Sequence, residues 1–196
     1  MGAVHLVLAG DPELRRILLL SLGVSGTATA LAAAVGIPAG VALAVGRVPG
    51  RGALRALVNT GMALPPVVVG LGMLLLLWRT APLGFLHLVY TPAAMVLAQL
   101  IVAAPLAAGL TASAVAALDQ DIPDALLVDG ASGARLGAEL VRSALPQVLT
   151  AVAAAFGRAI AEVGASLMVG GNILGQTRIL TTVSYTHLTL PTIYSV

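Results

Sequence analysis

Residues 17–46 read ILLLSLGVSGTATALAAAVGIPAGVALAVG and carry no charge between Arg16 and Arg47. A helix needs about 20 consecutive apolar residues to cross the hydrocarbon core of a bilayer. The stretch exceeds this minimum, so it predicts one membrane-spanning helix that is tilted or kinked. Pro38 is the expected position of the kink, because proline removes a backbone hydrogen bond inside a helix.

The composition of the whole chain agrees with a membrane environment. Hydrophobic residues make up 59% of the 196 positions and charged residues 9%, whereas a soluble domain carries roughly 25% charged residues. The spans lack a polar face, which excludes a coiled coil and a soluble helical bundle. The sequence therefore predicts an all-α integral membrane protein, a polytopic helical bundle of about four spans.

A second span is predicted from Ala56 to Trp78, with Pro65 and Pro66 near its start. Consecutive prolines cannot lie inside a helix without the loss of backbone hydrogen bonds. We therefore expect the full helix to begin after the prolines. The residues before them are expected to form irregular backbone covered by protein.

The remaining spans follow from the next uncharged stretches. We expect a loop over residues 80–91 and a third span over about 92–117, with Pro105 inside it. A fourth span is expected over 147–168, and a Gly-rich polar loop over 169–181.

Several classes of function are excluded by residue types that the chain lacks. All 10 basic residues are arginine, so a Walker A phosphate loop, which needs a lysine, is impossible. The absence of cysteine excludes thiol catalysis and cysteine-based metal sites. His5, His87 and His187 are isolated, so we expect no metal site and no cofactor. The arginines are spread along the chain, and no nucleic-acid partner is expected.

Gly36 and Gly40 have the small-xxx-small spacing that lets two helix backbones approach closely. In a membrane protein such a pair can form a dimer face. With 22 glycines in the chain, the same spacing also arises by chance. Both interpretations stay open at this point.

The polar segment 119–142, between the third and fourth spans, predicts a helix, a sharp turn and a second helix. Asp121 is expected to cap the first helix, and Gly130 to adopt the left-handed conformation that ends it. Ser132 is expected to cap a second helix that starts near Ala134. The alternative is an ordinary surface loop, although loops of this length tend to be functional.

At Asp124-Ala125-Leu126 and Gly130 the sequence resembles the cytoplasmic loop of binding-protein-dependent ABC importer permeases. That family has Glu-Ala-Ala, three residues and then Gly, so Asp replaces Glu here and Leu replaces the second Ala. The family's Leu-Pro pair, about a dozen residues after the Gly, is absent here; Arg142-Ser143 stand in its place, and Leu145-Pro146 come slightly later.

Four further stretches resemble the molybdate, tungstate and sulfate group of these permeases. Residues 63–71 (ALPPVVVGL) are similar to the segment that opens the second span, and residues 97–99 (LAQ) to the next span. Residues 161–165 (AEVGA) resemble the group's Glu-x-Gly-Ala signature, and residues 169–182 (VGGNILGQTRILTT) are closest to tungstate permeases. Together the similarities extend over about residues 15–183.

The resemblance implies the transmembrane subunit of an ATP-driven importer for an oxyanion such as tungstate or molybdate. This subunit would not itself be an enzyme. It would work as a homodimer in the lipid bilayer, with a separate cytosolic ATPase and an extracytoplasmic substrate-binding protein. The ATPase would contact a coupling loop that contains Asp124, Ala125, Leu126, Gly130, Ala131, Ser132 and Arg135. The family signature loop would contain Gly171, Asn172, Gly175, Thr177 and Arg178.

Two alternatives remain beside this interpretation. The same architecture can import sulfate or another small solute. A fragment of a secondary transporter would also fit broken helices, but it would leave the doubly capped polar segment unexplained.

Arg158 and Glu162 lie in the predicted fourth span, four residues apart and so on one helix face. Each alone would cost roughly 2.5–3.5 kcal/mol near the bilayer centre. A structural ion pair would remove much of this cost. The alternative is that both residues line the translocation path, where a carboxylate would repel an anion.

The resemblance places the N-terminus outside the cell and the 119–142 segment in the cytosol. This orientation has a small excess of arginine on the cytosolic side, as the positive-inside rule requires. Arg47, Arg51, Arg55, Arg135 and Arg142 lie inside, and Arg15, Arg16, Arg79 and Arg178 lie outside.

The composition changes at Ser184. The last 13 residues, SYTHLTLPTIYSV, contain no alanine, glycine or arginine. We therefore expect a permease domain over residues 1–183 and a tail of foreign origin over 184–196. The resemblance implies a fifth span of about 20 residues, which a short tail containing Pro191 cannot form. A genuine short extracellular tail is the alternative.

Overall fold

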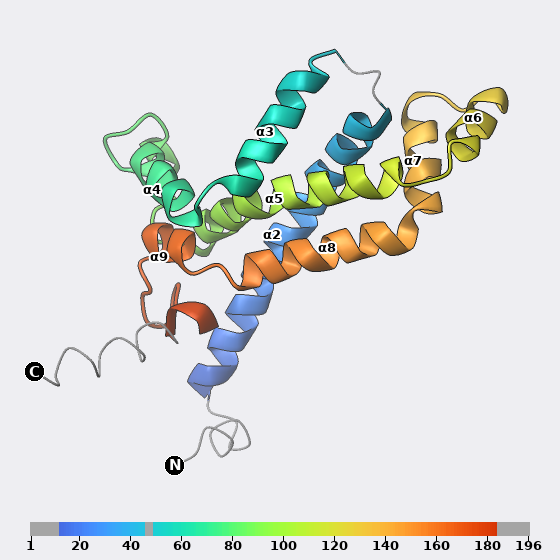
Figure 1. Cartoon of the computed structure of the whole chain (residues 1–196). Coiled ribbons are helices and arrows are strands. Elements are labelled where there is room, and N and C mark those ends of the chain that lie inside the picture. The colour runs from blue at the N-terminus through green and yellow to red at the C-terminus, as the bar shows by residue number, and fades with distance from the viewer. Residues whose placement is uncertain (1–11, 46–48, 184–196) are drawn as a thin grey trace, which may run out of the picture. The chain divides into compact units, whose positions relative to one another are not determined.

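The computed structural model describes residues 12–45 and 49–183, and every regular element within these residues is a helix (Figure 1). This confirms the predicted all-α class. The expected foreign tail at 184–196 lies outside the described residues. The elements are α2 (Pro12–Val45), α3 (Arg51–Ala63), α4 (Pro66–Leu77), the 3-10 helix η1 (Gly84–Leu86), α5 (Pro92–Ala116), α6 (Asp121–Val128), α7 (Gly133–Ser143), α8 (Leu145–Ile160) and α9 (Gly164–Gly170).

Helices α2 and α5 are each long and apolar enough to cross a membrane by themselves. Two more spans are possible if α3 with α4, and α7 with α8, each form one broken span, which gives up to 4 in the described part of the chain. The predicted first and third spans are confirmed, with Pro38 inside α2 and Pro105 inside α5. The loop predicted between the second and third spans is also confirmed, since it holds only turns and η1.

The second span differs from the prediction before its prolines. Leu64 and Pro65 have extended backbone, with ψ angles of 127° and 129°, and α4 begins at Pro66, the second proline, and not after both prolines as expected. A proline at the first helical position costs no hydrogen bond, and the residue before a proline is pushed out of the helical region. The expected irregular backbone before the prolines is wrong, because α3 is helical up to Ala63.

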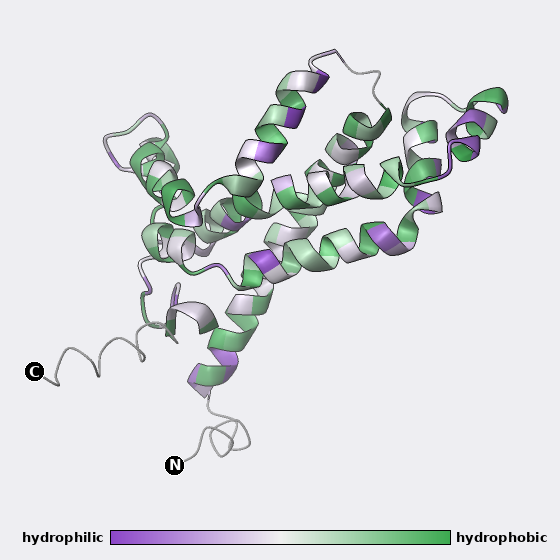
Figure 2. Ribbon diagram, viewed as in Figure 1, coloured by the Kyte–Doolittle hydropathy of each residue, from purple (hydrophilic) through white to green (hydrophobic). Residues whose placement is uncertain are grey.

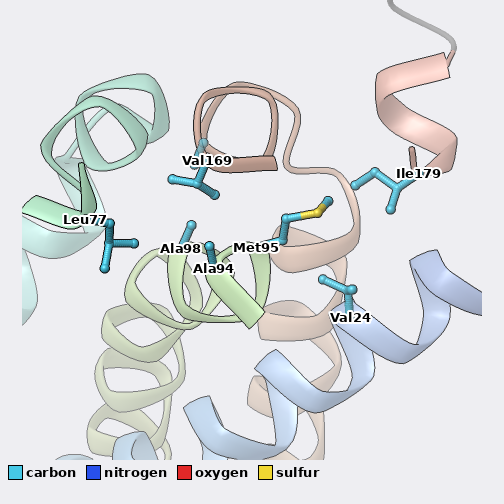
Figure 3. Close-up of a cluster of buried hydrophobic side chains, with 8 residues drawn as sticks. Val24, Leu77, Ala94, Met95, Ala98, Val169 and Ile179 are labelled. Atoms are coloured by element: carbon cyan, nitrogen blue, oxygen red, sulfur yellow. The ribbon is translucent and has the colours of Figure 1, made fainter. Parts of the chain in front are cut away.

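The chain divides into two compact units. The first contains the described parts of Met1–Ala28, Pro65–Gln99 and Ala159–Val196. Its core is a cluster of buried apolar side chains from α2, α4, α5, α9 and the segment after α9 (Figure 3). The cluster consists of Val24, Leu77, Ala94, Met95, Ala98, Ala165, Val169 and Ile179.

The second unit contains Thr29–Leu64 and Leu100–Arg158. In this unit α2 and α5 approach at Gly36 and Gly40. A Cβ built at Gly36 would lie 2.8 Å from the Cβ of Ala107, and one built at Gly40 would lie 2.5 Å from the carbonyl oxygen of Ala108. The Gly36/Gly40 spacing therefore serves close packing within one chain.

This packing predicts opposite outcomes for two glycines of the same helix. Gly40→Ala forces a methyl group onto the backbone of α5 and should destabilise the protein by about 1–3 kcal/mol. Gly23→Ala meets nothing within 4 Å and should be neutral or stabilise α2 by up to about 1 kcal/mol. Thermal unfolding in detergent, followed by far-UV circular dichroism, measures both. Equal shifts for the two variants would contradict the close approach of α2 and α5.

Candidate functional site

The first candidate site is the segment from α6 to α7, in the second unit. Helix α6 ends in a Schellman motif: Gly130 has a φ of 77°, and its N–H donates to the carbonyl of Leu127 at 3.1 Å. The N–H of Ala131 donates to the carbonyl of Leu126 at 2.9 Å. These bonds satisfy carbonyl groups at the end of α6 and turn the chain sharply into α7. The predicted helix, glycine turn and helix are confirmed.

The caps of the two helices differ from the prediction. Asp121 is the first residue of α6 and not its cap; the carboxylate of Asp119 accepts the N–H of Asp121 at 3.2 Å. Ser132 occupies the N-cap position of α7 as predicted, with φ −143°, but its hydroxyl makes no capping hydrogen bond. Both aspartates have a side chain suited to an N-cap, and sequence spacing does not say at which residue the helix starts.

Helix α7 is packed into the core of its unit, whereas α6 is exposed on the surface of that unit. Leu136 and Leu140 of α7 are buried in a cluster with Ala131, Ala144 and residues of α5 and α8. Helix α6 has no buried residue, and Val128 at its end is 88% exposed. Figure 2 shows hydrophilic residues recurring along α6, beside an apolar tip. A short helix with an exposed apolar end, held on an anchored neighbour, is suited to contact a partner.

The coupling-loop residues predicted from sequence fall on this presented surface, with two exceptions. Asp124, Ala125, Gly130, Ser132 and Arg135 are exposed, Leu126 is half-buried, and Ala131 is buried. Leu126 and Ala131 therefore hold the turn in place.

The second candidate site is the segment after α8, in the first unit. The predicted continuous helix over 147–168 is wrong, because α8 ends at Ile160 and α9 begins at Gly164. The buried carboxylate of Glu162 accepts the N–H of Ala165 at 2.8 Å, so it satisfies a free donor at the start of α9. The helical spacing that would place Arg158 and Glu162 on one face is therefore absent.

The signature loop after α9 is held by Thr177. The buried Thr177 hydroxyl accepts the N–H of Ile173 at 3.0 Å and donates to the carbonyl of Gly170. Gly171, Asn172 and Gly175 all have left-handed backbone, with φ of 69°, 50° and 73°. Glycine and asparagine are the residues that adopt this conformation most readily. The loop is therefore a defined structure, and the sequence predicted its position but not its hydrogen bonds.

Two polar contacts of the first unit were not predicted. The Gln99 amide of α5 donates to the hydroxyl of Ser166 in α9 at 3.2 Å, and both side chains are fully buried. Arg178 approaches Glu13 of α2 with a guanidinium–carboxylate distance of 3.9 Å. A buried polar residue in an apolar span signals a partner, but the sequence does not say which one. Within the described residues, no group of His, Asp and Glu side chains could hold a metal ion.

Apolar spans, a protruding helix-turn-helix segment and a glycine-rich loop define a polytopic helical membrane protein. Residues 36–190 match the family of binding-protein-dependent transport system inner membrane components. The chain belongs to this family and is a multi-pass membrane protein.

The chain is similar to several permeases of this kind. It is 43% identical over 168 residues to a probable anion ABC transporter permease protein of Haloferax volcanii, and the aligned region covers 83% of this chain and 72% of the relative. It is 38% identical over 181 residues to the tungstate uptake system permease protein TupB of Peptoclostridium acidaminophilum, which covers 92% and 79%. It is 32% identical over 177 residues to the putative molybdenum transport system permease protein YvgM of Bacillus subtilis, which covers 86% and 78%.

The cap at Glu162 predicts different effects for two substitutions. Glu162→Ala leaves the N–H of Ala165 without its acceptor and should destabilise the protein by about 0.5–2 kcal/mol. Glu162→Gln keeps a carbonyl acceptor and should cost less than half as much. Thermal unfolding in detergent checks both variants. If Gln and Ala at this position were equally destabilising, the negative charge and not the cap would be what matters.

Proposed function

We propose that this chain is the transmembrane permease subunit of an ATP-driven importer, and that it forms the path for an oxyanion such as tungstate or molybdate. The names of the relatives support this substrate class, since they refer to an anion, to tungstate and to molybdenum. Sulfate or another small solute is the alternative cargo of the same architecture. ATP hydrolysis would reside in a separate cytosolic subunit.

The observation that carries the proposal is that α6 is exposed while the neighbouring α7 is packed into the core. Its end is apolar, because Val128 is 88% exposed beside the half-buried Leu126 and Leu127. A contiguous apolar patch on an exposed helix is suited to contact with a protein partner. The family implies that α6 docks into a groove of a cytosolic ATPase. The Schellman turn at Gly130 joins α6 rigidly to α7, so a displacement of α6 would move α7 with it.

The displacement would continue into the membrane through packed side chains. Leu136 and Leu140 of α7 share one buried cluster with Val148 of α8 and Val115 of α5. Packed cores transmit displacements because they compress little. The coupling loop would therefore act on two helices of the same unit.

We further propose that the path lies between two copies of the chain. The described residues offer at most 4 spans, and a polar solute must be shielded from lipid on all sides. An extracytoplasmic binding protein would deliver the anion to this homodimer.

The proposed orientation, with the N-terminus outside and the α6–α7 segment in the cytosol, can be tested by cysteine labelling. The chain has no native cysteine, so Ser132→Cys introduces one exposed thiol on α7. An impermeant maleimide should label it in inverted vesicles but not in intact cells. Thr80→Cys, exposed in the loop after α4, should show the reverse pattern. Labelling of Ser132→Cys from outside intact cells would overturn the orientation.

The proposed function is tested in proteoliposomes that contain the permease, its ATPase and its binding protein. Uptake of tungstate or molybdate should require ATP, and the anion should stimulate ATP hydrolysis. Gly130→Val should abolish this stimulation, because a β-branched residue is strained at a positive φ. Gly130→Asn is the matched control and should keep most of it, since asparagine tolerates this conformation.

Two results would contradict the proposal. Uptake that needs an ion gradient and no ATPase would favour a secondary transporter. Full stimulation in the Gly130→Val complex would mean that the α6–α7 turn does not couple the two subunits.

A further inference from the structure

We propose that Arg15, Arg16 and Arg178 form an anion-receiving site on the first unit, where a tetrahedral oxyanion is held before it enters the translocation path. This inference rests on the proposed function and deepens it, because it assigns the site at which the substrate first contacts the permease. The three arginines come from the start of α2 and from the signature loop.

The arginines border two neighbouring hollows at this end of the unit. An open cavity of about 750 Å³ is lined by Arg15, Arg16, Leu19 and Gln176, among others. A second hollow of about 20 Å³ shares Arg16 and Gln176 with it and is also lined by Arg178. The larger cavity has room for a small hydrated anion, Gln176 adds an amide to it, and Arg178 lies beside it across the second hollow.

The signature loop is shaped to bring its arginine and the α2 arginines together. Gly175 has a φ of 73°, and a Cβ built on it would lie 3.7 Å from a terminal nitrogen of Arg16. The Arg16 guanidinium therefore lies against the loop backbone at Gly175, three residues before Arg178. Cations gathered in this way raise the local positive potential.

The Arg178 guanidinium has an N–H donor without an acceptor among the described residues. Its contact with Glu13 is 3.9 Å long, well beyond the roughly 2.7–2.9 Å of a charge-assisted hydrogen bond. Its buried Nε has no hydrogen-bond partner among the described residues. Buried donors are normally satisfied, and a small shift of the side chain would let an oxyanion accept from this guanidinium.

The placement of Arg15 and Arg16 points the same way. Both lie near the N-terminus of α2, where the helix dipole is positive and where acidic residues are favourable. Two cations there oppose helix stability but strengthen the attraction for an anion. Among the described residues that line the two hollows, Glu13 is the one carboxylate, so the balance of charge stays positive.

The chemistry selects the ligand class. Arginine presents a planar fork of N–H donors that matches two oxygens of an oxyanion. Arg15 and Arg16 are exposed to water, which screens their charge and makes the site weak and salt-sensitive. Weak binding suits a site that accepts the anion and then releases it inward.

The test measures binding of tungstate to the purified full chain in lipid nanodiscs, by equilibrium dialysis at low ionic strength. Arg16→Gln and Arg178→Gln should each weaken binding by about tenfold, since each removes charge-assisted hydrogen bonds. Glu13→Gln should tighten binding severalfold, because it removes the opposing carboxylate. Arg79→Gln, in the loop after α4 and outside the hollow, is the matched control and should leave the affinity unchanged. Equal unfolding temperatures show that all four variants are folded.

Two results would overturn the inference. The first is that Arg16→Gln and Arg178→Gln bind tungstate as tightly as Arg79→Gln does. The second is that they bind tungstate with unchanged affinity but no longer bind the substrate-binding protein, which would make the cluster a protein-docking surface. Tungstate uptake by the complete complex distinguishes failure of the anion site from failure of the proposed function. If the wild-type complex takes up tungstate and the variants bind it with unaltered affinity, only the anion site is refuted. Absence of oxyanion uptake by the wild-type complex refutes the proposed function.

Discussion

Close backbone contact between helices is the interaction on which each unit of this protein depends. Lipid is as apolar as a leucine side chain, so membrane helices gain little from burying hydrophobic surface against each other and associate mainly through van der Waals packing. Gly36 and Gly40 allow this contact between α2 and α5 in the second unit. In the first unit Gly70 of α4 lies against α9, where a built Cβ would be 2.6 Å from the Cα of Ala165. The scarcity of aromatic residues, 3% of the chain, follows from the same demand for small side chains.

The second constraint is that backbone groups freed at a helix break need partners inside the membrane. The chain meets it in two ways. At Pro65 and Pro66 the break costs few hydrogen bonds, because proline has no N–H and α4 begins at Pro66. Between α8 and α9 the Glu162 carboxylate supplies an acceptor, and the Glu162 carbonyl accepts the hydroxyl of Thr181 at 3.3 Å. Glu162 thus has a local structural reason to be buried, without reference to Arg158.

The sequence predicted features that depend on local rules and missed those that depend on distant partners. Uncharged length was enough to place α2 and α5, and the left-handed preference of glycine was enough to place the turn at Gly130. The end of α8 is the exception, because it was missed although its signal is local: Arg158, Glu162 and Gly164 surround the break, and Glu162 accepts an N–H only three residues further on. The approach of Arg178 to Glu13 joins residues far apart in the sequence, and no periodicity relates them. The roles of Arg158 and of the coupling-loop residues remain predictions.

The α6–α7 segment and the proposed arginine site have different physical characters, and this difference fits the proposed importer. The α6–α7 segment is rigid: its turn is fixed by two hydrogen bonds, and α7 is anchored through Leu140, which is 1% exposed. A rigid element is what a mechanical contact with an ATPase requires, because a flexible one would absorb the displacement. The arginines at the start of α2 are exposed, long and adaptable. An anion that must be captured and then released needs such partners, since tightly held and fully buried charges would bind it too strongly to let it move on. The rigid α6–α7 segment therefore lies where the ATPase would bind, and the weakly binding arginines lie where the anion would enter.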